Sequence, residues 1–356
     1  MATPKSAPLQ TPANRNVNNV VLGDLLFKPW NQSIYPEDLV AKDADRLYVC
    51  RWCFRYSCDV DIFEEHKRAC EHRITPPGTK VYDHGGYAVW EVDGQNHKLF
   101  GQNLSLFAKL FLDHKTVFFD VATFLYYILT FTDPDDSDSY YVLGFFSKEK
   151  LSWDANNLAC ILIFPPYQHK QLGKLLMGVS YKLSGWDSNG GCIGGPEKPL
   201  SELGHKSYVR FWAERIARFL LRGKPSGSSL ETDQQKPSST PKGSRKRPLR
   251  ETITVEELGQ GTGMLTEDVI TALKSMGLFE PQATPKKRKS TRTAAEEITT
   301  PPGQMVTICK SDVWEWAQAH HLSLDDPVRE EGFEGLWPPD IVSDGDGQSV
   351  VASEED

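Results

Sequence analysis

Three cysteines and one histidine in the stretch YVCRWCFRYSCDVDIFEEHKRACEH have the spacing of metal ligands. Cys50 and Cys53 form a Cys-x2-Cys pair, and after a gap of twelve residues His66 and Cys70 follow, four apart. The first pair can bind one ion from a tight turn, and the second pair shares one face of a helix. Thiolate and imidazole ligands select zinc, and four protein ligands leave no position for a substrate, so the predicted ion is structural. Cys58 is the competing ligand, but it has no partner at turn spacing.

A second stretch, NLACILIFPPYQHKQLGKLL at residues 157–176, joins an apolar run to a basic loop. The run around Cys160 predicts a buried strand, a proline pair ends it, and leucines at helical spacing follow. Backbone N–H groups at a helix start attract phosphate or pyrophosphate, and the basic residues of the loop add positive charge. A Walker loop is excluded, because no glycine-rich run precedes Lys174 and Leu175 replaces the required Ser or Thr. From the residues alone, an ordinary strand–turn–helix junction is an equally good interpretation.

Composition narrows the class of protein. The chain has 356 residues, enough for a sizeable core, and a net charge of −8 that favours a cationic partner over non-specific nucleic-acid binding. Seven cysteines, an odd number, indicate a reducing compartment. The N-terminus lacks the apolar segment of a secretory signal, and no apolar run approaches the roughly 20 residues of a membrane helix. We therefore expect a soluble protein with no membrane contact.

The elements that must position these residues alternate between strands and helices. Strands are predicted at residues 114–121, 140–147 and 157–164, and helices from residue 172 and over residues 207–221. A further helical block at residues 253–279 has Thr266 as a plausible N-cap. This alternation predicts an α/β or α+β core.

The chain resembles the MYST family of histone acetyltransferases from about Val20 to Pro339, apart from two polar inserts. VCRWCFRY, EVDGQNHKLFGQNLSLFAKLFLDHKTVFFDV, GFFSKEK, ACILIFPPYQ and GPEKPLSELG carry the resemblance. The sequence of the segment ACILIFPPYQ is most similar to that of the fungal silencing-associated (something-about-silencing) branch. The resemblance implies a GNAT-like acetyl-CoA-binding core between an N-terminal zinc-finger region and a C-terminal helix-turn-helix-like region.

Composition and the resemblance together imply a division of the chain. The expected segments are a disordered N-terminus at 1–18, an N-terminal region at 19–97 with the zinc finger at 45–73, the acetyl-CoA-binding core at 98–222, a basic disordered linker at 223–251, a helix-turn-helix-like region in two parts at 252–280 and 305–339, a basic disordered insert between them at 281–304, and an acidic tail at 340–356.

Residue roles follow from the same resemblance. Glu197, in GGPEKPL, is implied to be the general base that deprotonates the substrate lysine, whose ammonium is no nucleophile at neutral pH. Cys160 is implied to lie at the acetyl group, with a covalent acetyl-cysteine route and direct attack in a ternary complex both open. Lys115 matches the lysine that is autoacetylated in the family. The implied cofactor-binding residues are Cys160, Ile161, Ile163, Gln168, His169, Lys170, Gln171, Leu172, Gly173, Lys174 and Ser201.

Four positions depart from the family pattern. Gln171 replaces a glycine that lets the backbone approach the pyrophosphate, and His169 replaces an arginine. Gly195 replaces the usual serine. Arg210 stands where many members have a serine near the cofactor, and it can partly restore positive charge. Affinity for the cofactor is therefore the property that we expect to differ most from the family.

Partners and location are predicted from charge, from two basic clusters and from the resemblance. The acidic balance suits lysine-rich histone tails, and the resemblance implies histone H4 on nucleosomes, accessory subunits and a role in silencing or transcription. Basic clusters at 243–250 and 284–292 are typical of nuclear-import signals, although solubilising or weakly DNA-binding linkers are the alternative. Thr240 and Thr284 precede prolines beside these clusters, so phosphorylation there would reduce import.

Three functions compete at this point. The first is a nuclear lysine acetyltransferase that uses acetyl-CoA and a structural zinc ion. The second is a catalytically weakened scaffold or histone-binding subunit, suggested by Gln171 and His169. The third, a DNA-binding zinc-finger protein, leaves the core unexplained. DIFEEHKRAC carries as many acids as bases, so direct DNA binding is expected to be weak at most.

Overall fold

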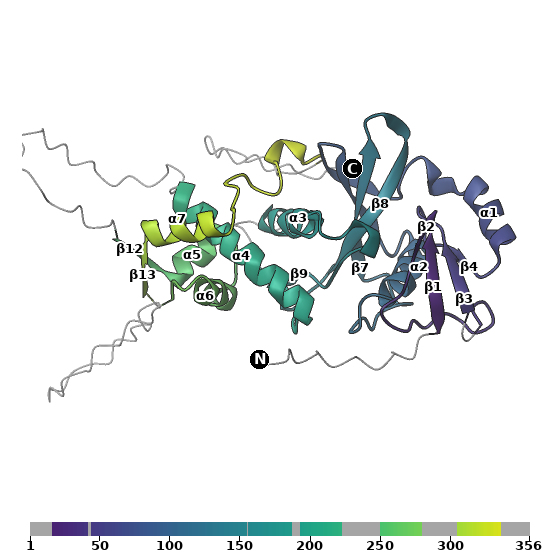
Figure 1. The fold of residues 1–356 in the computed structure, drawn as a ribbon, viewed down its shortest axis with the longest axis horizontal. Coiled ribbons are helices and arrows are strands. Elements are labelled where there is room, and N and C mark those ends of the chain that lie inside the picture. Colours follow the sequence, from purple (N-terminus) through teal and green to yellow (C-terminus); the bar gives the residue numbers. More distant parts are fainter. Residues whose placement is uncertain are drawn as a thin grey trace, which may run out of the picture.

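The computed structural model describes residues 16–41, 44–154, 156–186, 193–222, 250–279 and 305–335. These residues form a mixed α/β fold, which confirms the predicted class. One end of the molecule holds a small sheet and helix α1, the other holds the C-terminal helices, and a five-stranded sheet lies between them (Figure 1). Within the described residues, every helix is too short or too polar to cross a bilayer.

The N-terminal region is built on a four-stranded sheet of order β2-β1-β3-β4. Its elements are β1 (Val17–Leu22), β2 (Leu25–Phe27), β3 (Ala44–Val49), β4 (Tyr56–Ser57), α1 (Val60–Ala69) and the 3-10 turn η1 (Glu71–Arg73). Val17 is buried and pairs with Ala44 of the parallel strand β3. The predicted disordered N-terminus at 1–18 is therefore wrong at residues 16–18, because Asn16 hydrogen-bonds to Ser33 and tertiary pairing extends the strand into the Asn-rich segment, whereas residues 1–15 lie outside the described residues.

A five-stranded antiparallel sheet of order β10-β8-β7-β6-β5 forms the centre. Its strands are β5 (Thr79–His84), β6 (Tyr87–Asp93), β7 (Phe124–Asp133), β8 (Asp136–Glu149) and β10 (Cys160–Ile163). Alternate residues of β7 face two cores, as a strand buried on both faces requires. Tyr126 and Ile128 pack with α2 (Lys98–Lys109) and the N-terminal region, whereas Tyr127 and Leu129 pack with α3 (Leu172–Trp186).

Two strand predictions need correction. Residues 114–121 form a loop and not a strand. The segment pairs with none of the five strands of the central sheet, and Phe119 stays exposed, because the strand preference of a segment depends on its tertiary context. The predicted strand at 157–164 is split into β9 (Asn156–Leu158) and β10, and β9 pairs instead with β11 (Gly195–Pro196) in parallel. The predicted strand at 140–147 is confirmed within β8.

The C-terminal region packs around the long helix α4 (Glu202–Arg222). It contains β12 (Arg250–Thr254), α5 (Val255–Thr262), α6 (Thr266–Ser275), β13 (Met305–Cys309), α7 (Lys310–Ala319) and the 3-10 turn η3 (Glu330–Gly332), with β12 and β13 antiparallel. Helix α5 begins with a capping box from Thr254 to Glu257 and ends at the left-handed Gly263. The N-cap of α6 is Leu265, without a side-chain cap, so the predicted cap at Thr266 is wrong by one residue.

Several predictions fall outside the described residues. They concern most of the linker at 223–251, the insert at 281–304, the acidic tail at 340–356, the basic cluster at 284–292, all but one residue of the cluster at 243–250, and Thr240 and Thr284.

Candidate functional site

The four predicted zinc ligands meet at one point. Their ligand atoms all lie within 4.8 Å of one another, with Cys50 Sγ 3.8 Å from Cys70 Sγ and Cys53 Sγ 3.1 Å from His66 Nε2. Tetrahedral zinc with Zn–S bonds of about 2.3 Å places two sulfur ligands about 3.8 Å apart, so the donor set fits the ion. Cys58 is exposed and lies outside the cluster. These four residues would hold a structural zinc ion, as the spacing predicts.

Local structure explains how the ligands converge. The side chain of Asp59 caps α1 by accepting hydrogen bonds from the backbone N–H groups of Asp61 and Ile62. His66 then lies in the last turn of the helix, and Cys70 is its C-cap residue. The other two ligands come from the turn that joins β3 to β4.

The turn that carries Cys50 and Cys53 also reaches the core. Phe54 follows this pair, is fully buried and has a positive φ of 61°. Its ring lies 5.5 Å from that of Phe107 and 5.7 Å from that of Phe164. Phe164 directly precedes the proline pair of the predicted cofactor loop. The metal-binding turn therefore supports the end of the strand that is predicted to bind acetyl-CoA.

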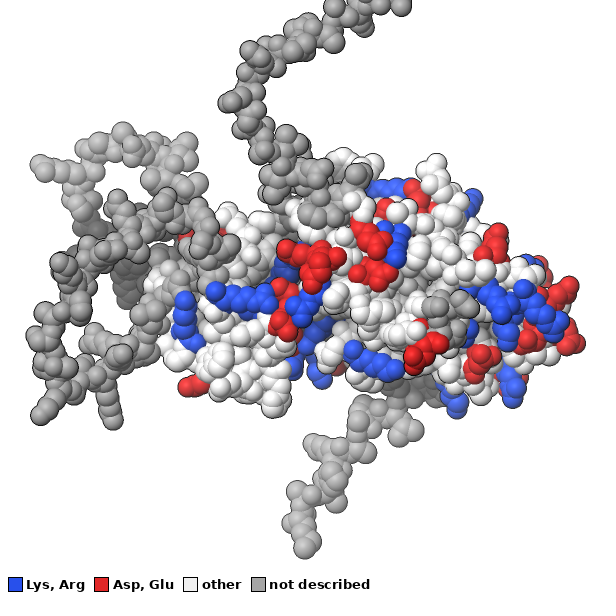
Figure 2. Space-filling model, turned by 90° about the horizontal axis from the view of Figure 1, so that it is seen from above, with Lys and Arg blue, Asp and Glu red and all other residues white. Residues whose placement is uncertain are grey.

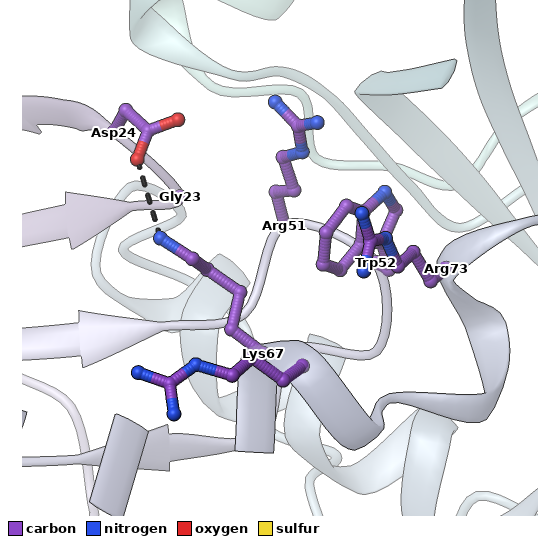
Figure 3. Close-up of a pocket in the computed structure, with 7 residues that line it drawn as sticks. Gly23, Asp24, Arg51, Trp52, Lys67 and Arg73 are labelled. Atoms are coloured by element: carbon purple, nitrogen blue, oxygen red, sulfur yellow. Dashed lines mark hydrogen bonds and ion pairs between the residues drawn. The ribbon is translucent and has the colours of Figure 1, made fainter. Parts of the chain in front are cut away.

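A cationic pocket of about 270 Å³ lies beside the metal site (Figure 3). It is lined by Gly23, Asp24, Arg51, Trp52, Lys67, Arg68 and Arg73. Lys67 pairs with Glu64 and Asp24, whereas the Arg51 guanidinium hydrogen-bonds to Ser139 and lies over the Trp52 ring. In Figure 2, Lys and Arg side chains gather at this end of the molecule among acidic neighbours. The α1 segment contains equal numbers of acidic and basic residues, so its sequence did not predict that Lys67 and Arg68 would both line a cationic pocket.

The two predicted catalytic residues and the predicted autoacetylation site come from three separate segments. Lys115 lies in the loop after α2, Cys160 begins β10, and Glu197 follows β11. Burial lowers the pKa of Lys115, which is 7% exposed, and the electrostatic influence of the nearby Cys160 and Glu197 side chains partly raises it again. Both groups are thus within electrostatic reach of the lysine, and the fold brings together residues that are far apart in the sequence.

Backbone contacts fix two of these residues. The N–H group of Glu197 donates to the carbonyl oxygen of Leu158 at 2.8 Å, and the N–H group of Cys160 donates to Ser147 Oγ at 3.3 Å. Burial raises the pKa of Glu197, the negative charge of Glu149 raises it further, and Lys115 opposes the shift. A carboxylate with a raised pKa is a better proton acceptor near neutral pH.

Ser147 and Glu149 were missed in the sequence. Both lie in GFFSKEK, a stretch that carries the family resemblance, and both are at the end of β8. Ser147 is the pairing partner of Cys160 across β8 and β10. This relation is set by sheet register, which a single sequence does not reveal.

The predicted pyrophosphate loop connects β10 to α3 through the 3-10 turn η2 (Pro165–Tyr167). Ile161 and Ile163 are half-buried in β10, and Gln168 Nε2 donates to the Ile163 carbonyl oxygen at 2.9 Å. Gln171 has a φ of 63°, which glycine adopts without strain. The loop conformation thus agrees with the glycine that the family has at this position.

The remaining loop residues divide by exposure. His169, also at positive φ, and Lys170 are exposed, and Leu172 is buried at the start of α3. A Cβ atom on Gly173 would meet no atom within 4 Å. Ser201 is exposed, and its Oγ accepts a hydrogen bond from the Gly204 N–H group at 3.1 Å in the first turn of α4.

Lys174 is held by a buried carboxylate. Its Nζ lies 2.6 Å from Glu214 Oε1, and Arg210 Nε lies 2.8 Å from the same oxygen. Burial raises the pKa of Glu214, but hydrogen bonds from Lys174 and Arg210 outweigh it and lower the pKa overall. Arg210 also donates to the carbonyl oxygen of His320 at 2.9 Å. The role of Arg210 at the cofactor stays a prediction.

Comparison with known proteins defines the class. A model of the MOZ/SAS family matches residues 75–307, and a model of the MYST family zinc finger domain matches residues 14–70. The chain therefore belongs to the MOZ/SAS family, and the predicted MYST membership is confirmed. The α/β architecture, with its metal-ligand cluster at the N-terminal end, is consistent with the predicted GNAT-like core.

Individual relatives carry acetyltransferase names. The chain is 36% identical to "Histone acetyltransferase Tip60 homolog" of Caenorhabditis elegans over 266 residues, which cover 75% of this chain and 52% of the relative. It is 36% identical to "Histone acetyltransferase ESA1" of Debaryomyces hansenii, with 74% and 52% covered, and 36% identical to "Histone acetyltransferase MOF" of Drosophila melanogaster, with 74% and 28% covered. The chain thus spans about half the length of the first two relatives.

Proposed function

We propose that the chain is a nuclear histone acetyltransferase that transfers an acetyl group from acetyl-CoA to a lysine of a histone tail. The observation that supports this proposal is the backbone hydrogen bond from Glu197 to Leu158, which lies two residues before Cys160 of β10, with Lys115 within electrostatic reach of the Glu197 and Cys160 side chains. The family and the names of its relatives support the same reaction.

Glu197 is the proposed general base. The target lysine arrives as an ammonium with an ordinary pKa of about 10.4, so it must lose a proton before its nitrogen can attack. Glu197 accepts that proton as a carboxylate, and its raised pKa brings it closer to the working pH. The new C–N bond then replaces the C–S bond of the thioester, and the coenzyme leaves as a thiol.

Cofactor binding is assigned to the strand and loop that precede α3. Bound acetyl-CoA would supply the reactive thioester, held beside Cys160, Ile161 and Ile163. The loop from Gln168 to Lys174 would hold its pyrophosphate, with Ser201 as a further contact. Cys160 keeps both open roles, as an acetyl carrier or as a neighbour of the reacting group.

The substrate and the partners are proposed from chemistry and family. An acidic chain suits a lysine-rich histone tail, and we propose histone H4 as the substrate. Action on nucleosomes, accessory subunits, a silencing role and the fungal silencing branch belong to the same proposal. Nuclear import would use the basic clusters at 243–250 and 284–292.

A weakened acetyltransferase that acts as a scaffold is the second candidate. The pairing of Lys174 with Glu214 favours it, because a lysine held by a carboxylate has less charge to offer a pyrophosphate. The strained Gln171 points in the same direction.

One experiment separates the two candidates. Acetyl-CoA binding is measured by calorimetry on the zinc-loaded chain and on Lys174→Met, and turnover is measured with histone H4 for wild type and Glu197→Gln. The enzyme predicts micromolar binding that Lys174→Met weakens, and a loss of roughly 10² to 10⁴ in turnover for Glu197→Gln. Glu256→Gln, an exposed change on α5, serves as the control with unchanged turnover. A folded chain that does not bind acetyl-CoA would favour the scaffold.

A further inference from the structure

The loop that carries Glu197 is tied to the C-terminal region by the next residue. Lys198 Nζ lies 2.7 Å from Asp268 Oδ1 and also pairs with Glu267. Both acids belong to the first turn of α6. A side chain adjacent to the proposed base is therefore held by a helix outside the acetyl-CoA-binding core.

Asp268 is a buried carboxylate whose one cationic partner in the described part of the chain is Lys198. Its side chain is 2% exposed, and Oδ2 has no hydrogen-bond partner among the described residues. Burial raises the pKa of Asp268, and the hydrogen bond from Lys198 lowers it. Because a buried carboxylate without a cation is strongly unfavourable, Asp268 and Lys198 stabilise each other. Glu267 is largely exposed, so its pair with Lys198 contributes little.

The backbone before Glu197 also lies against α6. A Cβ atom on Gly195 would lie 2.7 Å from Asp268 Oδ2 and 3.0 Å from Leu265 Cδ1, so this strand residue packs with no room for a side chain. Gly194 forms a bridge with Met264 at the turn between α5 and α6. On the other side, the Glu197 N–H group is bonded to Leu158 of β9. The loop is thus held between β9 and the turn between α5 and α6.

We propose that Asp268 is a positioning residue for the reaction and holds Glu197 in place through Lys198. The α5–α6 unit of the helix-turn-helix-like region then acts on the acetyltransferase site and is more than a surface for partners. This inference rests on the proposed role of Glu197 as general base. A displacement of about 1 Å at a reacting group can cost on the order of 10² in rate, so a tether on the adjacent residue matters.

The test uses the full zinc-loaded chain. Asp268→Asn keeps the shape of the side chain but removes its charge, and Lys198→Met removes the partner. We expect each variant to lower kcat roughly 10-fold to 100-fold, with KM for acetyl-CoA and its dissociation constant unchanged. The double variant should be no worse than either single one, and Lys198→Arg should recover most of the turnover. Glu330→Gln, which removes the exposed Lys182–Glu330 pair between α3 and η3, is the matched control.

The outcomes separate this inference from the function on which it rests. Turnover that survives in Glu197→Gln would overturn the role of the base itself. Turnover lost in Glu197→Gln but normal in both Asp268→Asn and Lys198→Met would overturn only the positioning role. Additive losses in the double variant would also overturn it, because the two residues would then act independently. If Asp268→Asn does not fold, the comparison of Lys198→Met with Lys198→Arg decides, since Lys198 is partly exposed.

Discussion

The metal site and the proposed catalytic site are assembled in opposite ways. All four metal ligands fall within residues 50–70, on one turn and the helix that follows it. The catalytic site draws on residues 115, 160 and 197, which come from a loop, a strand and the end of a second small sheet. The first is local and depends on spacing, whereas the second exists only once the central sheet and the C-terminal region have formed.

The two sites are nevertheless connected. Phe54, on the metal-binding turn, packs against Phe164, the last residue before the proposed cofactor loop. Phe107 contacts both rings and completes the cluster. Loss of the metal should therefore disturb the cofactor loop as well as the N-terminal region.

Removal of zinc is expected to have the largest effect. Structural zinc contributes about 10–16 kcal/mol to the folding of zinc-finger peptides, so a Cys70→Ser variant should lose bound zinc and the fold of the N-terminal region. Acetyl-CoA binding should weaken as well, through the contact of Phe54 with Phe164. Metal content, thermal melting and calorimetry measure the three effects.

Cys58→Ser is the matched control for this prediction. Cys58 lies in the same segment but is exposed and outside the ligand cluster, so zinc content and melting should not change. A Cys70→Ser chain that keeps a full complement of zinc would contradict the ligand assignment. Normal acetyl-CoA binding without zinc would instead show that the two sites are independent.

The same contrast explains what could be predicted from the sequence. Cys50, Cys53, His66 and Cys70 were all found from spacing, because their geometry is set by a tight turn and one helix. Glu197 came only from family resemblance, since nothing in GGPEKPL reveals which strand accepts its backbone hydrogen bond.

The residues and elements that were predicted wrongly or not at all share one physical cause, the pairing of segments that are distant in the sequence. Asp268 was not predicted because it meets Lys198 only when α6 packs beside the loop. Residues 114–121 have the composition of a strand but pair with no strand of the central sheet, so their local preference alone did not produce a strand. Val17 belongs to a strand because Ala44 pairs with it, although its neighbours are polar.

The acid limb of the pH profile gives the next, smaller effect. Glu197 works as a carboxylate, so turnover is present above its pKa and is lost as pH falls through it. Glu149→Gln removes a negative charge that raises this pKa, so the acid limb of log(kcat/KM) should move to lower pH. Lys115→Met removes a positive charge that lowers the pKa, so the limb should move to higher pH.

Opposite shifts are the diagnostic result. Two shifts in the same direction, or none in either variant, would mean that Glu197 does not control the acid limb. Loss of the Lys115 charge through acetylation should act as Lys115→Met does, which makes the modified chain an independent check. Substitution of a metal ligand should not shift the acid limb in this way, because none of the metal ligands is among the charged groups that act on the pKa of Glu197.

The smallest effect is expected at Gln171. The positive φ of Gln171 costs a residue with a side chain roughly 1–2 kcal/mol. Glycine removes this strain, but it also gives the unfolded chain more conformational entropy, which lowers stability by about 0.4–1 kcal/mol. Gln171→Gly should therefore raise the free energy of unfolding by roughly 0–1.6 kcal/mol, as measured in urea. Gln171→Ala, which keeps the strain but trims the exposed side chain, should give no gain in stability.

Acetyl-CoA affinity then identifies which property of Gln171 matters. If the side chain crowds the pyrophosphate, glycine and alanine should both tighten binding. If the backbone must come closer than a Cβ allows, glycine alone should do so. Unchanged affinity in both variants would remove one of the two reasons for a weakened site and leave only the pairing of Lys174 with Glu214. The cofactor loop would then tolerate a substitution at one of its positions. The metal site cannot tolerate the loss of a ligand, because each ligand is one of only four.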